Sequence, residues 1–336
     1  MAKFIIPWSY RHDHEDGHRT IAPFVLMLYF SPDSKLPKLR ISIVEFLNTA
    51  PLVWGFTDGP LAGKYDLSFA VPSQCAEALK RGDVDVAIIP AIEYQRIDNT
   101  VVLPGMAVAA DGEVRSLLVV SKKPIDRAKR IALDTSSRAT VALVKMLAPG
   151  YWKINPEFVD AVPDPSEMLR NADAALIIGD PALRIAIKFD QLSNNVPSED
   201  RCCQGDPDDM PVQGFETLFI YDVAQQWREM TGKPCVLAIW AGRKEAITPE
   251  VVADFQASKE YGVSRVREIA EAASIKLDLP IPELERYLTE NVRFDLDNNN
   301  LPGLRLYFEK AARLGLIPQN KPIEFAGAPV GARSAP

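Results

Sequence analysis

The sequence predicts an α/β protein with two lobes and mainly parallel sheets. From Arg40 onward, short apolar runs typical of buried strands alternate with helical patterns, and this alternation favours strands joined by helices. The chain has 336 residues, of which 47% are hydrophobic, so it can bury two separate cores. Three of the predicted strands end in polar residues directly before a helix, which indicates a cleft at the strand ends.

The elements follow in chain order. RISIVEF, residues 40–46, is predicted to be a strand, and PSQCAEALKRG a helix with Ser73 as N-cap and Gly82 just after its end. VDVAIIP, residues 84–90, has the apolar run of a buried strand. Further strands are expected over 114–121, 130–134, 174–180 and 235–243, and helices over 136–147, 181–187 and 221–232. Residues 193–214 are predicted to form a loop, and 248–316 to be helical with breaks at 277–282 and 296–303.

Composition excludes several classes of function. A net charge of −7 without a dense basic stripe argues against nucleic acid as a partner. The four cysteines, Cys75, Cys202, Cys203 and Cys235, form no metal-binding or disulfide pattern, which fits a reduced cytoplasmic protein. The apolar stretch 21–30 is half the length needed to span a bilayer and follows an acidic segment, so neither a membrane span nor a signal peptide is expected.

Both ends of the chain are expected to be flexible. Residues 1–39 hold all three histidines, His12, His14 and His18, in a polar tract. One such run without a second ligand cluster is more often a flexible extension than a metal site, and we expect no metal. Residues 331–336 are predicted to be a disordered tail.

The three polar strand ends are the candidate site. Helix N-termini that follow strands direct unpaired N–H groups and a partial positive charge at a cleft, so these ends predict a pocket that accepts anions. Each end also has a simpler interpretation as a helix cap, which is favoured for any one of them taken alone. The three ends are Asn48-Thr49 in VEFLNTAP, Thr135-Ser136-Ser137 in IALDTSSRAT, and Gly179-Asp180 in LIIGDPAL.

Histidine is absent from the chain after His18. The body therefore has no imidazole base, no Ser-His-Asp triad and no HExxH zinc helix. If the protein is an enzyme, its proton transfers depend on carboxylates, amides, hydroxyls, water or the substrate.

Six segments, taken in order and spacing, resemble the chorismate dehydratase (MqnA) family of the futalosine route to menaquinone, over roughly residues 40–315. They are VEFLNTAPL, PSQCAEALKRGDVDVAIIPAIEY, GEVRSLLVVSKKPI, RIALDTSSRATVALVKML, ADAALIIGDPAL and YDVAQQWREMTGKPCVLAIWAGR. The resemblance implies the two-lobed fold of type II periplasmic binding proteins, with mixed sheets and the substrate cleft between the lobes. It implies one lobe from 40–118 plus 238–330 and an inserted lobe from 119–237.

The implied reaction removes water from chorismate to give 3-[(1-carboxyvinyl)oxy]benzoate. The implied partner is this small molecule, with no redox cofactor and no metal; a homodimer is compatible with the family. A dicarboxylate suits a cleft lined by hydroxyls and helix N-termini.

Residue roles follow from the resemblance. Asn48 matches the family's "LN" motif, and its amide is expected to orient the ring carboxylate or the leaving hydroxyl. The proton acceptor stays open between Glu93 and the enolpyruvyl carboxylate of chorismate, with a preference for the latter. The expected substrate-binding residues are Thr49, Arg115, Ser116, Thr135, Ser136, Ser137, Gly179 and Asp180.

The chain also departs from the family pattern. It has Ala139-Thr140 where the family usually has Thr-Ser, so a hydroxyl contact is expected to be missing or shifted. The 193–214 loop is longer than expected, and residues 1–39 have no counterpart.

Two alternatives remain. A 1,4-dihydroxy-6-naphthoate synthase of the same pathway shares the fold, but it uses a histidine base that this body lacks. A solute-binding protein that closes on a carboxylate without chemistry is the other alternative, because fold alone does not decide function.

Overall fold

The computed structural model describes residues 38–192, 202–204, 208 and 210–327. The three histidines, residues 1–37 of the predicted extension, much of the 193–214 loop and the 331–336 tail lie outside these residues.

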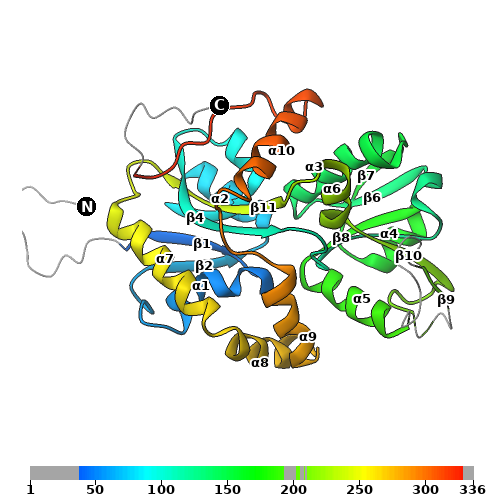
Figure 1. Ribbon diagram of the computed structural model, residues 1–336, viewed down its shortest axis with the longest axis horizontal. Helices are drawn as coiled ribbons and strands as arrows, with labels where there is room; N and C mark the ends of the chain where they lie inside the picture. Colours follow the sequence, from blue (N-terminus) through cyan, green and yellow to red (C-terminus); the bar gives the residue numbers. More distant parts are fainter. Residues whose placement is uncertain (1–37, 193–201, 205–207, 209, 328–336) are drawn as a thin grey trace, which may run out of the picture. The chain divides into compact units, whose positions relative to one another are not determined.

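Two β-sheets form the framework, as the sequence predicted (Figure 1). The first sheet has the order β2-β1-β3-β11-β4. Strand β1 is parallel to β2 and β3, whereas β11 is antiparallel to both β3 and β4. The strands of this sheet are β1 (Arg40–Val44), β2 (Asp66–Ala70), β3 (Val86–Pro90), β4 (Thr100–Ala110) and β11 (Cys235–Arg243).

The second sheet has the order β7-β6-β8-β5-β10-β9. Strand β6 is parallel to β7 and β8, while β5 is antiparallel to β8 and β10, so this sheet is mixed as well. The strands are β5 (Leu117–Ser121), β6 (Arg130–Asp134), β7 (Glu157–Ala161), β8 (Ala174–Ile178), β9 (Cys202–Gln204) and β10 (Thr217–Asp222).

Helices complete two lobes, one around each sheet. The first lobe holds the first sheet and α1 (Ala50–Thr57), α2 (Pro72–Arg81), α7 (Pro249–Val263), α8 (Val266–Leu277), α9 (Ile281–Arg286) and α10 (Leu301–Arg313). The second lobe holds the second sheet and α3 (Arg138–Leu147), α4 (Pro165–Asn171), α5 (Gly179–Leu192) and α6 (Val223–Thr231). Shorter turns are η1 (Leu47–Thr49), η2 (Ala91–Arg96), η3 (Ile125–Arg127), η4 (Ala148–Trp152) and η6 (Tyr287–Asn291).

Burial explains part of the strand prediction, although β4 is almost wholly buried and was not predicted. Every residue of β3, β5 and β8 is buried, and their continuous apolar runs are typical of strands covered on both faces. Strands β2 and β7, which the sequence did not predict, lie at sheet edges and are partly exposed. Strand β9, at the other edge of the second sheet, lies within the predicted 193–214 loop, so that part of the prediction was wrong.

Three local predictions need correction. Helix α2 has Val71 as N-cap, and Ser73 instead donates its backbone N–H to the carbonyl of Ser136 at 2.9 Å. Strand β5 begins at Leu117, not at 114, because Arg115 has a left-handed φ of 65° that a strand does not allow. Helix α3 begins at Arg138, two residues later than predicted.

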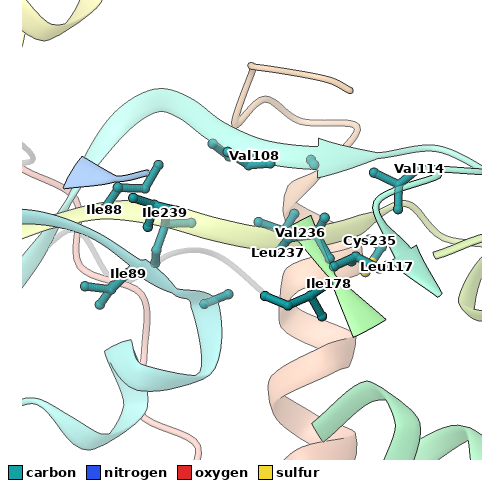
Figure 2. Close-up of a cluster of buried hydrophobic side chains, with 14 of the residues drawn as sticks. Ile88, Ile89, Val108, Val114, Leu117, Ile178, Cys235, Val236, Leu237 and Ile239 are labelled. Atoms are coloured by element: carbon teal, nitrogen blue, oxygen red, sulfur yellow. The ribbon is translucent and has the colours of Figure 1, made fainter. Parts of the chain in front are cut away.

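One hydrophobic cluster joins the two lobes (Figure 2). Val236 and Leu237 of β11 belong to the same cluster as Leu117 of β5 and Ile178 of β8. The ends of strands from both sheets are therefore held close together where the lobes meet.

Candidate functional site

A small cavity of about 40 Å³ lies where the lobes meet. Its polar lining comes from Asn48 and Thr49 in the first lobe and from Ser137 and Thr140 in the second, and Gly179 lies beside them. The structure thus brings the three polar strand ends of the sequence to one cavity. Its apolar lining is Val44, Phe46, Pro72, Pro90, Val108, Leu117, Ile178, Leu237 and Ala238.

Asn48 and Thr49 form the first strand end, in the turn η1 between β1 and α1. Both are buried, and neither side chain makes a capping hydrogen bond to α1 within the described residues. The Thr49 hydroxyl lies 2.5 Å from the carbonyl oxygen of Val44 and 2.8 Å from that of Phe46. Thr49 occupies the N-cap position of α1 with Pro51 in the first turn, as the capping interpretation expected. Its hydroxyl bonds to these two carbonyls instead of to the helix, and it holds the backbone turn that places Asn48 against the cavity.

Gly179 and Asp180 form the second strand end and touch the first lobe. Gly179 has φ of 68°, and a Cβ atom at this position would lie 2.7 Å from the Phe46 ring. The carboxylate of Asp180 accepts a hydrogen bond from the backbone N–H of Leu47 at 3.0 Å. This bond connects Asp180 to the first lobe instead of to its own helix. Burial is the main cause that raises the pKa of Asp180, and the bond from Leu47 opposes it.

The remaining strand end, Thr135-Ser136-Ser137, lies between β6 and α3. The Ser137 and Thr140 hydroxyls lie 2.8 Å apart and both face the cavity, whereas Thr135 is exposed and Ser136 is half-buried. Ser137 occupies the N-cap position of α3, within the predicted 135–137, although no side chain in the described residues makes a capping hydrogen bond to this helix. The sequence analysis expected a missing or shifted hydroxyl contact at Ala139-Thr140. Ala139 has no hydroxyl, but Thr140 beside it lines the cavity.

Ser116 is buried and bonded to a residue that the sequence analysis did not single out. The Tyr287 hydroxyl donates to the Ser116 Oγ at 2.8 Å. Burial strongly raises the pKa of Tyr287, so the hydroxyl keeps its proton at neutral pH. Tyr287 lies in a long helical pattern, and no local signal distinguishes it from a core aromatic residue.

Arg115 and Glu93 do not line this cavity. The Arg115 guanidinium pairs with Asp190 and with Glu283, the latter at 3.1 Å. Glu93 is only 2% exposed and pairs with Arg96 at 2.5 Å and with Arg138 at 3.1 Å.

Arg138 also connects the lobes. From the start of α3 it reaches Glu77 in α2 at 2.7 Å and Glu93 in η2 at 3.1 Å. Together with the bonds from Leu47 to Asp180 and from Ser73 to Ser136, it holds the two sides of the cavity against each other.

A larger hollow of about 370 Å³ borders the cavity. Val44, Phe46 and Thr49 line both spaces. Phe46 therefore lies between the small cavity and a more open space next to α1 and α8, and both spaces have mostly apolar linings.

Two solved structures define the class of fold. Protein AF1704 from Archaeoglobus fulgidus is 18% identical with a TM-score of 0.63, covering 83% of this chain and 98% of that one. The periplasmic aliphatic sulphonate binding protein SsuA from Escherichia coli is 13% identical with a TM-score of 0.53, covering 84% and 94%. The two α/β lobes and these structural matches make this a protein of the periplasmic-binding-protein fold, as the resemblance implied.

A family model described as menaquinone biosynthesis matches residues 39–313. The chain belongs to this menaquinone biosynthesis family, and the resemblance to its chorismate dehydratase (MqnA) members is confirmed. A curated relative, the chorismate dehydratase of Thermus thermophilus, is 29% identical over 248 residues, or 71% of this chain and 84% of that protein. Every helix in the described residues is too short or too polar to cross a membrane.

Proposed function

We propose that this protein is a chorismate dehydratase that converts chorismate to 3-[(1-carboxyvinyl)oxy]benzoate, the first step of the futalosine route. The observation that carries the proposal is the convergence of Asn48, Ser137 and Gly179, from three strand ends, on one cavity in a chain of this family. The similarity to the Thermus thermophilus enzyme supports the same reaction.

The reaction needs little from the protein beyond orientation. One ring C–H bond and the C–O bond of the neighbouring hydroxyl break, a ring double bond forms, and water leaves. Aromatisation of the ring supplies the driving force. Chorismate carries two carboxylates, and the N-termini of α3 and α5, whose partial positive charge favours anions, both lie at the cavity.

Chorismate enters, in this proposal, by movement of the lobes. A cavity of about 40 Å³ is far smaller than the ~300–1,000 Å³ of pockets that bind small organic ligands. We propose that the two lobes move as separate bodies, one made of residues 40–118 with 238–330 and the other of residues 119–237. The chain passes between the lobes near Leu117 and near Cys235, and the motion occurs about these two places. The substrate then binds in the opened cleft and is enclosed on closure.

Asn48 is the proposed orienting residue and the hydroxyls opposite it are the proposed carboxylate anchors. Ser137 and Thr140 reach the cavity directly. Ser136 and Thr135 lie at the more exposed start of α3, where they meet the substrate only in the opened cleft. Gly179 shapes the wall of the cavity, Asp180 lines the neighbouring hollow, and Ser116 lies outside the cavity lining, bonded to Tyr287.

The proton acceptor in this proposal is the enolpyruvyl carboxylate of the substrate. Glu93 is paired with two arginines and lies outside the cavity lining, so its carboxylate is engaged elsewhere. Within the described residues, the polar side chains of the cavity lining are an amide and hydroxyls, which bind and orient but are weak bases at neutral pH.

The test is to mix the purified protein with chorismate and follow products by chromatography and mass. We expect a new benzoate lighter than chorismate by one water. Asn48→Asp should still bind chorismate but turn over at least ~100-fold more slowly, as when a group that stabilises the transition state is lost. Asn171→Asp, on the exposed end of α4, is the matched control and should keep normal turnover.

Two outcomes would contradict the proposal. Unchanged chorismate with tight binding would indicate a solute-binding protein. Near-normal turnover of Asn48→Asp would remove the orienting role from Asn48 while leaving the reaction in place.

A further inference from the structure

Arg115 lies on the segment of chain that passes from the first sheet to the second, between β4 and β5. Its side chain is only 4% exposed, and its backbone has a left-handed φ of 65°. The carboxylate of Asp222, the residue before α6, accepts the backbone N–H groups of Val114 at 3.0 Å and of Arg115 at 2.6 Å. A residue other than glycine keeps such a backbone only where its surroundings fix it, which is common at functional sites.

The guanidinium of Arg115 connects helices of the two lobes. It pairs with Glu283 of α9 in the first lobe at 3.1 Å, and it also pairs with Asp190 of α5 in the second lobe. A guanidinium presents five N–H donors in a fixed plane, so one buried arginine can hold two carboxylates in a defined arrangement. The position of α5 relative to α9 is therefore linked through a single side chain.

The first-lobe side of this connection is fastened at several points. Residues spaced four apart over 281–291, which lie on one side of a helix, contact the segment that joins β4 to β5. The pairs are Glu283 with Arg115, Tyr287 with Ser116 at 2.8 Å, and the Asn291 side-chain amide with the Glu113 carbonyl at 3.2 Å. Arg293 then exchanges backbone hydrogen bonds with Ala109 of β4 at 2.7 and 2.8 Å. The bond from Arg115 to Asp190 extends this fastened segment to the second lobe.

Asp190 lies in the last turn of α5, and the first turn of the same helix belongs to the candidate site. Helix α5 begins at Gly179, which lines the cavity, and Asp180 bonds to Leu47 of the first lobe. Residues 180 and 190 are about 15 Å apart along the helix axis, and both act on the orientation of one rigid element. The two ends of α5 are thus both tied to the first lobe when the cleft is closed.

We propose that Arg115 is a positioning residue that bridges the lobes and holds the cleft closed, instead of binding substrate. The bridge runs from α9 through the guanidinium to α5, so it fixes the helix whose N-terminus forms part of the cavity wall. This inference deepens the proposed movement of the lobes and therefore rests on the proposed function. Loss of the bridge favours the open cleft while each lobe stays folded.

Hydrogen exchange in the unliganded protein tests the bridge with Asp190→Ala. Asp190 is 42% exposed, so this variant should fold. Two backbone N–H groups report opening, because each donates to the other lobe: that of Leu47 to Asp180 at 3.0 Å and that of Ser73 to Ser136 at 2.9 Å. Both should exchange about fivefold faster in the variant, as for the loss of a partly exposed ion pair, while the amides of β3 keep their wild-type rates.

Asp295→Ala is the matched control, and Asp190→Glu is the rescue. Asp295 also pairs with a mostly buried cation, Lys259 at 2.8 Å, but both of these residues belong to the first lobe. Loss of this pair should leave the exchange of Leu47 and Ser73 unchanged. Asp190→Glu keeps the negative charge, so it should return both amides towards their wild-type rates.

Each result decides the question. Unchanged exchange of Leu47 and Ser73 in Asp190→Ala, or an equal acceleration in Asp295→Ala, would overturn the bridging role. An equal acceleration of the β3 amides would overturn it too, because that pattern indicates a loss of overall stability instead of opening. Failure of the proposed function is distinguishable, since a wild type that leaves chorismate unchanged removes the reaction, whereas the exchange experiment uses no ligand.

Discussion

Gly179→Ala should weaken closure of the cleft more than it weakens folding. Two costs follow from adding one methyl group. The left-handed φ of 68° costs an alanine about 1 kcal/mol, and this cost is present whether the lobes are open or closed. The new Cβ would also lie 2.7 Å from the Phe46 ring, and because Phe46 belongs to the other lobe, this overlap exists only when the lobes are closed.

The overlap sets the magnitude of the effect on activity. Overpacking of this kind costs about 1–3 kcal/mol, and Phe46 borders the hollow of about 370 Å³, so its ring has space to shift. We therefore expect the lower part of the range, about 1–2 kcal/mol. If closure precedes chemistry, kcat/KM for chorismate should fall about 5- to 30-fold.

Gly232→Ala separates the two costs. Gly232 ends α6 with φ of 66°, nearly that of Gly179, but a Cβ there meets no atom within 4 Å. Urea denaturation should give both variants a similar loss of about 1 kcal/mol in unfolding free energy, while only Gly179→Ala loses kcat/KM. Equal kcat/KM in the two variants would refute the reasoning, as would failure of Phe46→Leu to restore activity in the Gly179→Ala background.

Two further substitutions act on the contacts between the lobes. Arg138→Gln removes the ion pairs with Glu77 and Glu93. KM for chorismate should then rise about fivefold, which corresponds to about 1 kcal/mol for a partly exposed ion pair. A rise in KM that does not shrink at high salt would contradict an ionic link. Burial raises the pKa of Asp180, so its contribution to folding stability is full below the unfolded-state pKa and is lost as pH rises through the folded-state pKa. In urea denaturation, Asp180→Asn should therefore lose less unfolding free energy than the wild type as pH rises through this range. An equally steep fall in the variant would assign the pH dependence to other groups.

The sequence predicts the buried strands of the framework and the polar residues at the ends of three strands well. Buried strands such as β3 and β8 have continuous apolar runs, and the polar residues that end β1, β6 and β8 follow from the alternation itself. The ends of β6 and β8 meet by the geometry of one parallel pair, whereas β1 belongs to the other sheet, so its convergence with them depends on how the two sheets meet.

The role of individual hydroxyls and amides could not be predicted in this way. Asn48, Thr49 and Asp180 all have the residue types of helix caps, and local propensity favours that use. The structure instead pairs Thr49 with strand carbonyls and Asp180 with Leu47, 133 positions away. Such pairings depend on how the lobes meet, which no window of sequence contains.

Tyr287 shows the same limit more strongly. A tyrosine in a helical pattern is usually a core residue, and this one is indeed buried. Its hydrogen bond to Ser116 joins a π-helical turn to a residue 171 positions away in the sequence. Edge strands such as β2 and β7 were missed for a simpler reason, since partial exposure removes the apolar run that marks a buried strand.

The contacts across the cleft also bear on how fast a ligand can associate. In the proposed opening of the lobes, the contacts of Leu47 with Asp180 and of Ser73 with Ser136 separate before a molecule larger than the cavity of about 40 Å³ reaches Asn48. An opening step that precedes encounter makes association slower than the ~10⁵–10⁷ M⁻¹s⁻¹ that is common for binding without rearrangement. In a stopped-flow experiment, the observed binding rate should then level off at high chorismate concentration, and the plateau gives the rate constant for opening of the lobes.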